Sequence, residues 1–215
     1  LPWLHDFSRY GSWQQSHPEI VCGIKRGFSF FKHYPGKKFT TDENHTNELL
    51  VAASTDDMQS DTNWLRADLD AFLVNKVKEA GINYIDLTEI IKAQRNTKWE
   101  FHSSRFNERN IIHASFFIDA TGSDGLLDKL LGIESSADEY LTNSMAIFSH
   151  FNHVLRWTDK LQKAGIPIDD FPYNPDNSAL HHILDEGWLW MLRFNDQRTS
   201  FGFVLDDSSA FYKNL

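Results

Sequence analysis

The chain has 215 residues, of which 41% are hydrophobic and 24% charged, a balance typical of a globular protein with a buried core. A formal net charge of −9, without a long basic run, argues against nucleic acid or an anionic membrane surface as a partner. The single cysteine, Cys22, excludes an internal disulfide and lies in an apolar run. We therefore expect a buried, inert thiol and a cytoplasmic protein.

No apolar run approaches the roughly 20 residues of a membrane span. The chain opens on LPWLHDFSRYGSW, which indicates the interior of a longer protein. The elements that follow alternate irregularly between strands and helices. Strands are predicted over residues 19–33, 83–91, 98–103, 111–121 and 144–151. Helices are predicted over 63–80 and 124–131, a surface loop over 34–47, and either a strand or a helical turn over 48–54.

The segment from Ile111 to Thr121 ends in a continuous apolar run, as expected of a strand that is buried on both faces. Gly122 breaks the strand before a helix begins. In α/β sheets, nucleotide phosphates bind where the carboxyl end of a strand leads into a helix. Asp119, Thr121 and Gly122 are therefore candidate ligand contacts, and the alternative is an ordinary turn.

Residues 153–177 contain a possible helix and a Pro- and Asp-rich loop, and are interpreted as an insertion. The next segment, LHHILDEGWLWMLRFNDQRTSFGFV, predicts a β-hairpin. Trp188 and Trp190 share one face of a strand whose other face carries Leu189 and Met191. Since both faces are apolar, the strand lies between two layers or lines a cavity. Two indoles on one face suit an aromatic ligand or a flavin, although core packing explains them equally well.

These segments together resemble the FAD-dependent oxidoreductases of the flavin-dependent halogenase type, in the tryptophan halogenase and FAD monooxygenase superfamily. The resemblance covers roughly residues 1–206, through GIKRGFSFFKH, WLRADLDAFL, FFIDATG, HHILDEGWLWMLRF and TSFGFVLD. The Gly-Trp-x-Trp element is the part most specific to halogenases. The chain departs from the family in lacking its G-x-G-x-x-G loop and its G-D-A-A/D-P segment, and in carrying WLWMLR where the family has W-x-W-x-I-P.

The resemblance implies an α/β fold, bordering on α+β, with a mixed β-sheet, flanking helices and no N-terminal dinucleotide-binding motif. Residues 1–215 would be the central part of the enzyme, with FAD-contacting segments at about 62–132 and a substrate-side sheet at about 18–54 and 144–206. The implied activity is halogenation of an electron-rich aromatic or carrier-bound substrate. FAD would be reduced by a separate flavin reductase, and halide would be a co-substrate.

Two alternatives stay open. One is a flavin-dependent monooxygenase or reductase of the same fold, which the missing Ile and Pro favour. The other is a non-catalytic fragment that does not hold flavin, which the missing phosphate loop favours because no helix N-terminus would take the pyrophosphate.

The resemblance also assigns roles to individual residues. Lys25, five residues before Phe30, matches the halogenase lysine that captures the oxidant, a role that needs an amine in a dry pocket. The residues alone favour a lysine exposed on a strand edge. Trp188 and Trp190 would line the tunnel to this lysine, with Phe30 and His182 beside the substrate.

Arg66, Asp119, Thr121 and Gly122 would lie beside the flavin. For Arg66 the alternative is a surface arginine paired with Asp68 or Asp70, since a cation in a first helical turn opposes the helix dipole. His181 and His182 are adjacent on a strand and point to opposite faces, so they are interpreted as structural, with one of them near substrate. No metal site is expected.

Overall fold

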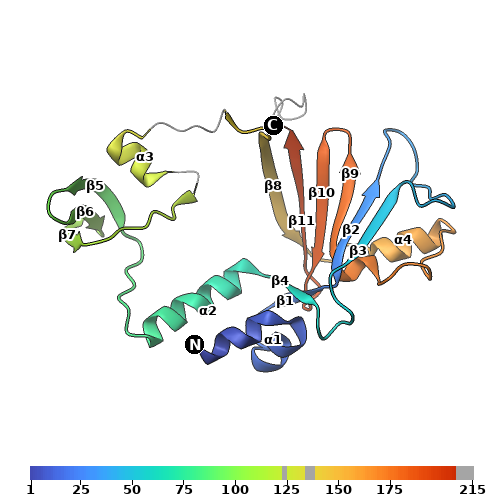
Figure 1. The fold of residues 1–215 in the computed structure, drawn as a ribbon, viewed down its shortest axis with the longest axis horizontal. Helices are drawn as coiled ribbons and strands as arrows, with labels where there is room; N and C mark the ends of the chain where they lie inside the picture. Colours follow the sequence, from blue (N-terminus) through green and yellow to red (C-terminus); the bar gives the residue numbers. More distant parts are fainter. Residues whose placement is uncertain (123–124, 134–138, 207–215) are drawn as a thin grey trace. The chain divides into compact units, whose positions relative to one another are not determined.

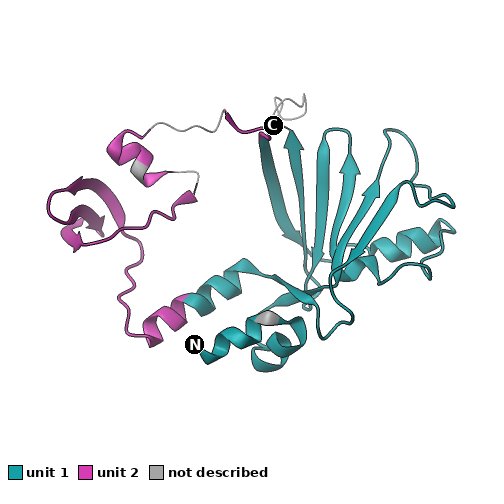
Figure 2. Ribbon diagram, viewed as in Figure 1, with its two compact units in different colours: residues 1–73, 144–215 teal, residues 74–143 magenta. Residues whose placement is uncertain are grey.

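The computed structural model describes residues 1–122, 125–133 and 139–206, and the chain forms two compact units (Figure 2). Unit 1 contains Leu1–Leu73 and the chain from Ser144 onward, and unit 2 contains Val74–Asn143. Within the described residues no helix combines the length and apolar character needed to cross a membrane.

Unit 1 is built on a six-stranded sheet (Figure 1). Four of the five neighbouring pairs are antiparallel, and the pair of β2 and β9 is parallel, so the predicted mixed sheet is confirmed. In spatial order the strands are β3 (Glu48–Ala52), β2 (Gly27–Lys32), β9 (Ala179–Leu184), β10 (Gly187–Arg193), β11 (Thr199–Asp206) and β8 (Ser144–Phe151).

One face of this sheet is covered by α4 (Trp157–Lys163) and the segment that follows it, which includes the 3-10 turn η4 (Pro175–Asn177). The buried cluster between them contains Phe31, Leu161, Ile166, Leu180, Leu189 and Met191. Residues 153–177 are therefore part of the core of unit 1, and the interpretation as an insertion is wrong.

The N-terminal part of unit 1 forms a second core. Its sheet has two strands, β1 (Cys22–Lys25) and β4 (Asp61–Trp64). Three helical elements pack beside this sheet: η1 (Pro2–Ser8), α1 (Tyr10–Ser16) and the start of α2 (Arg66–Glu79). Cys22 is fully buried in this core, as expected. Burial raises the pKa of its thiol to about 11.

Two predicted boundaries in this region are wrong. The strand predicted over 19–33 is two strands in different sheets, separated at Arg26. The backbone of Arg26 turns aside because its N–H donates to Asn177 and its carbonyl accepts from Ala53. The helix predicted from residue 63 begins at Arg66, since the residues before it pair with β1.

Unit 2 is a three-stranded antiparallel sheet of β5 (Glu89–Arg95), β6 (Trp99–Arg105) and β7 (Glu108–Ala114), with a short helix α3 (Leu126–Leu131). The strand predicted over 83–91 is displaced, and residue 124, the predicted start of the second helix, lies outside the described residues. The doubly buried strand predicted over 111–121 is wrong: β7 ends at Ala114, and Phe116 and Ile118 are 78% and 75% exposed. Phe117 packs against Phe101 with ring centroids 4.6 Å apart, but within the described residues no strand pairs with 115–121, so this segment is not a strand covered on both faces.

Candidate functional site

The face of the six-stranded sheet opposite α4 carries seven ring-bearing side chains, which we call the aromatic face. They come together because strand pleating sends alternate residues to one side and the register aligns them across strands. His181 pairs with Phe30 on β2 and with Trp190 on β10, while Gly202 on β11 lies between Trp190 and Phe148. The aromatic face consists of Phe28, Phe30, Phe148, His150, His181, Trp188 and Trp190.

Three rings at one end of the aromatic face have nearly parallel planes. The His181 ring lies 5.0 Å from that of Phe30, at 17°, and 6.4 Å from that of Phe28, at 19°. Phe28 and Phe30 are themselves 6.5 Å apart at 9°. These offset rings provide a flat apolar surface against which a planar ligand can pack.

At the other end Trp190 lies across β11. Its Nε1 donates to Oγ of Ser200 at 3.2 Å, and its ring lies 5.8 Å from that of Phe148. A Cβ at Gly202 would be 2.6 Å from Trp190 Cζ2 and 2.4 Å from Phe148 Cβ, so only glycine leaves room for the indole here. Trp188, two residues earlier on the same face, is 40% exposed.

Lys25 reaches the Phe28 end of the aromatic face. Its Nζ lies 4.4 Å from the centroid of the Phe28 ring and 3.9 Å from Oδ2 of Asp61, with 23% of the side chain exposed. Neighbouring side chains lead from this amine through Phe28 and His181 to Trp190. The structure therefore brings Lys25, Phe30 and both tryptophans to one side of the sheet.

His182 lies on the opposite face, among the core residues. Its Nδ1 is 2.8 Å from Nε2 of His33, and its ring meets that of Trp157 edge-on at 4.6 Å. Burial, with the neighbouring His33, lowers the pKa of His182 to about 3. His182 is thus not brought together with the other predicted tunnel residues, and His181 takes its place. Alternation along the strand separates the two histidines, but only the register with β2 and β10 identifies which one faces the indoles.

The predicted flavin contacts are divided between the units. Arg66 begins α2 in unit 1 and is 77% exposed, with its guanidinium bonded to Asp70 at 2.9 and 3.1 Å. In unit 2, Oδ1 of Asp119 accepts from the N–H and the hydroxyl of Thr121, at 2.9 and 2.7 Å. Gly122 follows with φ +70°, a left-handed conformation that favours glycine, and a Cβ there would meet no atom within 4 Å. The described residues contain no group of three or more His, Cys, Asp or Glu side chains that could hold a metal ion.

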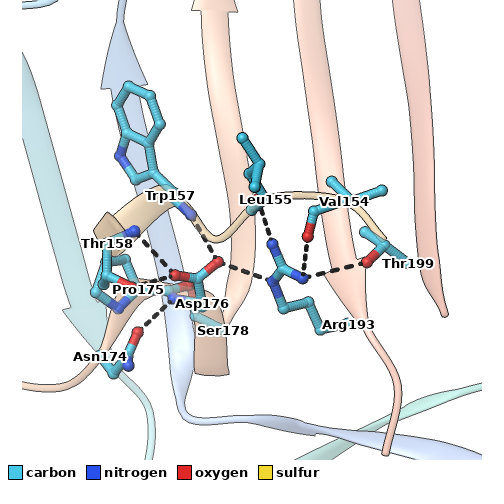
Figure 3. A network of polar contacts seen from close by, with 10 residues as sticks. All are labelled: Val154, Leu155, Trp157, Thr158, Asn174, Pro175, Asp176, Ser178, Arg193 and Thr199. Carbon is cyan, nitrogen blue, oxygen red and sulfur yellow. Dashed lines mark hydrogen bonds and ion pairs between the residues drawn. The ribbon is translucent and has the colours of Figure 1, made fainter. Parts of the chain in front are cut away.

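A buried ion pair that sequence reasoning missed fixes α4 against the sheet (Figure 3). Asp176 accepts from the N–H groups of Trp157 and Thr158, each at 3.0 Å, and from Nε of Arg193 at 2.9 Å. Burial alone would raise the pKa of Asp176, but these hydrogen bonds hold it below its usual range. Arg193 also donates to the carbonyls of Val154 and Leu155. Since Arg193 stands where the halogenase motif has proline, this departure from the family has a structural role.

Comparison with known proteins relates the chain to halogenases. It is 21% identical over 174 residues to tetracycline 7-halogenase of Kitasatospora aureofaciens, and the aligned region covers 81% of this chain and 30% of that protein. It is 22% identical over 200 residues to monodechloroaminopyrrolnitrin halogenase PrnC of Pseudomonas fluorescens, and the aligned region covers 93% of this chain and 33% of that protein. The chain is a distant homologue of flavin-dependent halogenases. No family model matches it.

Solved structures agree with this homology. Halogenase PltM in complex with phloroglucinol and FAD superposes with a TM-score of 0.80 and 25% identity, over 97% of this chain and 40% of PltM. The flavin-dependent halogenase CmlS shares the fold, with a TM-score of 0.64 and 18% identity over 94% of this chain and 32% of CmlS. The chain thus matches the halogenase fold over part of its length, and spans about a third of the curated relatives.

Proposed function

We propose that the protein is an FAD-dependent oxidoreductase of the halogenase type, which acts on an electron-rich aromatic or carrier-bound substrate. The observation that carries this proposal is the aromatic face, with Lys25 at its end, on a sheet related to those of flavin-dependent halogenases. A halogenase needs an amine that faces an apolar passage rather than bulk water, because water would consume a hypohalous oxidant. The contact of Nζ with the Phe28 ring supports that role.

The residues proposed to hold FAD are compatible with it. Gly122 leaves its backbone open to close approach by a ligand, and Arg66 offers an exposed guanidinium that could exchange Asp70 for an anionic group of the cofactor. In this proposal residues 62–132 contact FAD, while 18–54 and 144–206 form the substrate side. When bound and reduced by a partner flavin reductase, FAD supplies the oxidising equivalents for halide.

In this proposal the chain's own residues do three things. Lys25 donates N–H groups to the oxidant and holds it at the end of the aromatic face. The Phe28 and Phe30 rings orient a planar substrate by packing against it. Trp188 and Trp190 form an apolar wall that limits the entry of water.

The test uses the full-length protein with FAD, a flavin reductase, NADH and bromide, and phloroglucinol as the first substrate. We expect flavin absorbance to stay with the protein on gel filtration and a brominated product to appear, with bromination lost in Lys25→Met. Lys163→Met, exposed on α4 at the other face of the sheet, is the matched control and should remain active. An oxygenated product without bromination would favour the monooxygenase alternative, and a protein that does not retain flavin would contradict the proposal as a whole.

A further inference from the structure

A groove on the α4 side of the six-stranded sheet lies between α4 and the loop that joins β2 to β3 (Figure 1). It has a volume of about 520 Å³. Its floor is aromatic: the Phe39 and Trp157 rings meet edge-on at 5.5 Å, and they contact Phe31 of the core at 5.5 and 5.4 Å. Because Phe31 is fully buried, these contacts hold the floor in place without a ligand.

The groove carries positive charge on both of its walls. Lys38 extends from the loop and Lys160 from α4, and both residues are exposed. Among the described residues that line the groove none is acidic, and neither lysine forms an ion pair within that part of the chain. The whole chain, in contrast, has a formal net charge of −9. A basic groove on an acidic protein favours a partner that brings negative charge to this one place.

The two walls also restrict the shape of the partner. Cations on opposite sides of an apolar floor match acidic groups on both sides of an apolar stripe, which is the pattern of an amphipathic helix. Since α4 has seven residues, it is about 10 Å long, the length of two helical turns. A helix laid along α4 would place its residues i, i+3, i+4 and i+7 on the floor. An anionic lipid surface, in contrast, would also meet the negative charge of the rest of the chain.

We propose that this groove docks an acidic amphipathic helix of a protein partner. The apolar residues of the helix pack on Phe39 and Trp157, and its Asp or Glu residues pair with Lys38 and Lys160. Ala164, exposed at the end of α4, also lines the groove, and its small side chain leaves room for the helix to approach. The groove and the aromatic face are on opposite sides of the sheet, so a docked helix leaves the aromatic face uncovered.

The experiment measures the dissociation constants of two fluorescein-labelled helical peptides by fluorescence anisotropy with the full-length protein. One peptide has Leu at i, i+3, i+4 and i+7 with Glu on both flanks, and the other has Lys in place of every Glu. We expect the Glu peptide to bind about 10-fold more tightly, and Lys38→Glu/Lys160→Glu to weaken its binding by about 10-fold, because two modest attractions become repulsions. Lys32→Glu/Arg156→Glu reverses two exposed cations outside the groove and is the matched control, which should keep the wild-type affinity.

A further variant tests the floor while keeping both lysines. Ala164→Trp fills the groove from an exposed position and should abolish binding of the Glu peptide. Circular dichroism establishes that each variant folds, and the single lysine variants replace the double one if it does not. Equal affinities for the two peptides, or an equal loss in the control variant, would overturn the inference. So would binding to vesicles of phosphatidylcholine and phosphatidylserine without binding to the Glu peptide.

Discussion

At the scale of single residues, the pleat of β9 gives two adjacent histidines opposite environments. His181 stacks with Phe30 on the aromatic face, whereas His182 pairs with His33 in the core. Burial lowers the pKa of all three histidines, so each is neutral near pH 7. Neutrality has a different consequence on each face: His181 keeps one unprotonated ring nitrogen, and in the core one imidazole can donate a hydrogen bond to the other.

The His33–His182 pair makes stability depend on pH. The pKa of His182 is lowered to about 3 and that of His33 is lowered too, whereas an unfolded histidine has a pKa of about 6.5. Below pH 6.5 the unfolded chain binds more protons than the folded one. The free energy of unfolding should therefore fall as pH drops from about 6.5 towards about 3, by up to about 1.4 kcal/mol per pH unit for each histidine. Urea unfolding at pH 7.5, 6.0 and 5.0 measures this slope.

His182→Gln should make that slope shallower, because glutamine does not titrate in this range. His150→Gln, at an exposed position of β8, should leave the slope unchanged. The same pH dependence in His182→Gln and wild type would show that other groups are responsible.

At the scale of elements, α4 depends on one carboxylate supplied by a distant part of the chain. Asp176 satisfies two N–H groups at the start of the helix and balances the Arg193 guanidinium (Figure 3). Asp176→Ala should lower the free energy of unfolding by about 3–5 kcal/mol, because it leaves a largely buried cation without its partner. Asp196→Ala breaks the more exposed pair with Arg198 and should cost less than about 1 kcal/mol. Urea denaturation compares the two variants, and equal losses would contradict the argument.

The packing of β10 on β11 depends on the absence of a side chain at Gly202. A Cβ there would meet Trp190 Cζ2 at 2.6 Å and the carbonyl oxygen of Ile147 at 2.8 Å. Gly202→Ala should lower the free energy of unfolding by about 1–3 kcal/mol through overpacking, and should shift the tryptophan emission as the indole moves. Ser149→Ala, exposed on the neighbouring strand, should change neither. Unaltered emission and stability in Gly202→Ala would mean that the indole does not lie over this glycine.

Local patterns predicted the β9–β11 region and most of α2 because alternation and helical spacing are strong there. They could not predict that residues 22–32 divide between two sheets, since the partner strands are far away in sequence. Likewise, the sequence shows that both faces of β10 are apolar, with Trp188 on one and Leu189 on the other. It does not show which face is covered; the packing of Leu189 in one cluster with α4 identifies the core side. The candidate site was predicted residue by residue from the family resemblance, and the replacement of His182 by His181 required the register.

At the scale of the whole molecule, the two units differ in how much apolar surface they bury. Unit 1 contains two clusters of buried hydrophobic residues, one against the six-stranded sheet and one around Trp13. In the three strands of unit 2 the buried hydrophobic residues are Ala93 and Phe101. Because apolar burial is the main source of stability, unit 2 should open at a lower free energy than unit 1.

Hydrogen exchange followed by mass spectrometry tests this difference on matched strands. Both β6 and β10 are hydrogen-bonded on each side within their own sheets, so an edge position explains neither result. We expect the amides of β6 to exchange at least about 10-fold faster than those of β10, since local opening follows the amount of buried apolar contact. Equal exchange rates for the amides of β6 and β10 would contradict this prediction, because the two units would then open in a single cooperative step. In that case the stability of β6 would come from outside its own three strands.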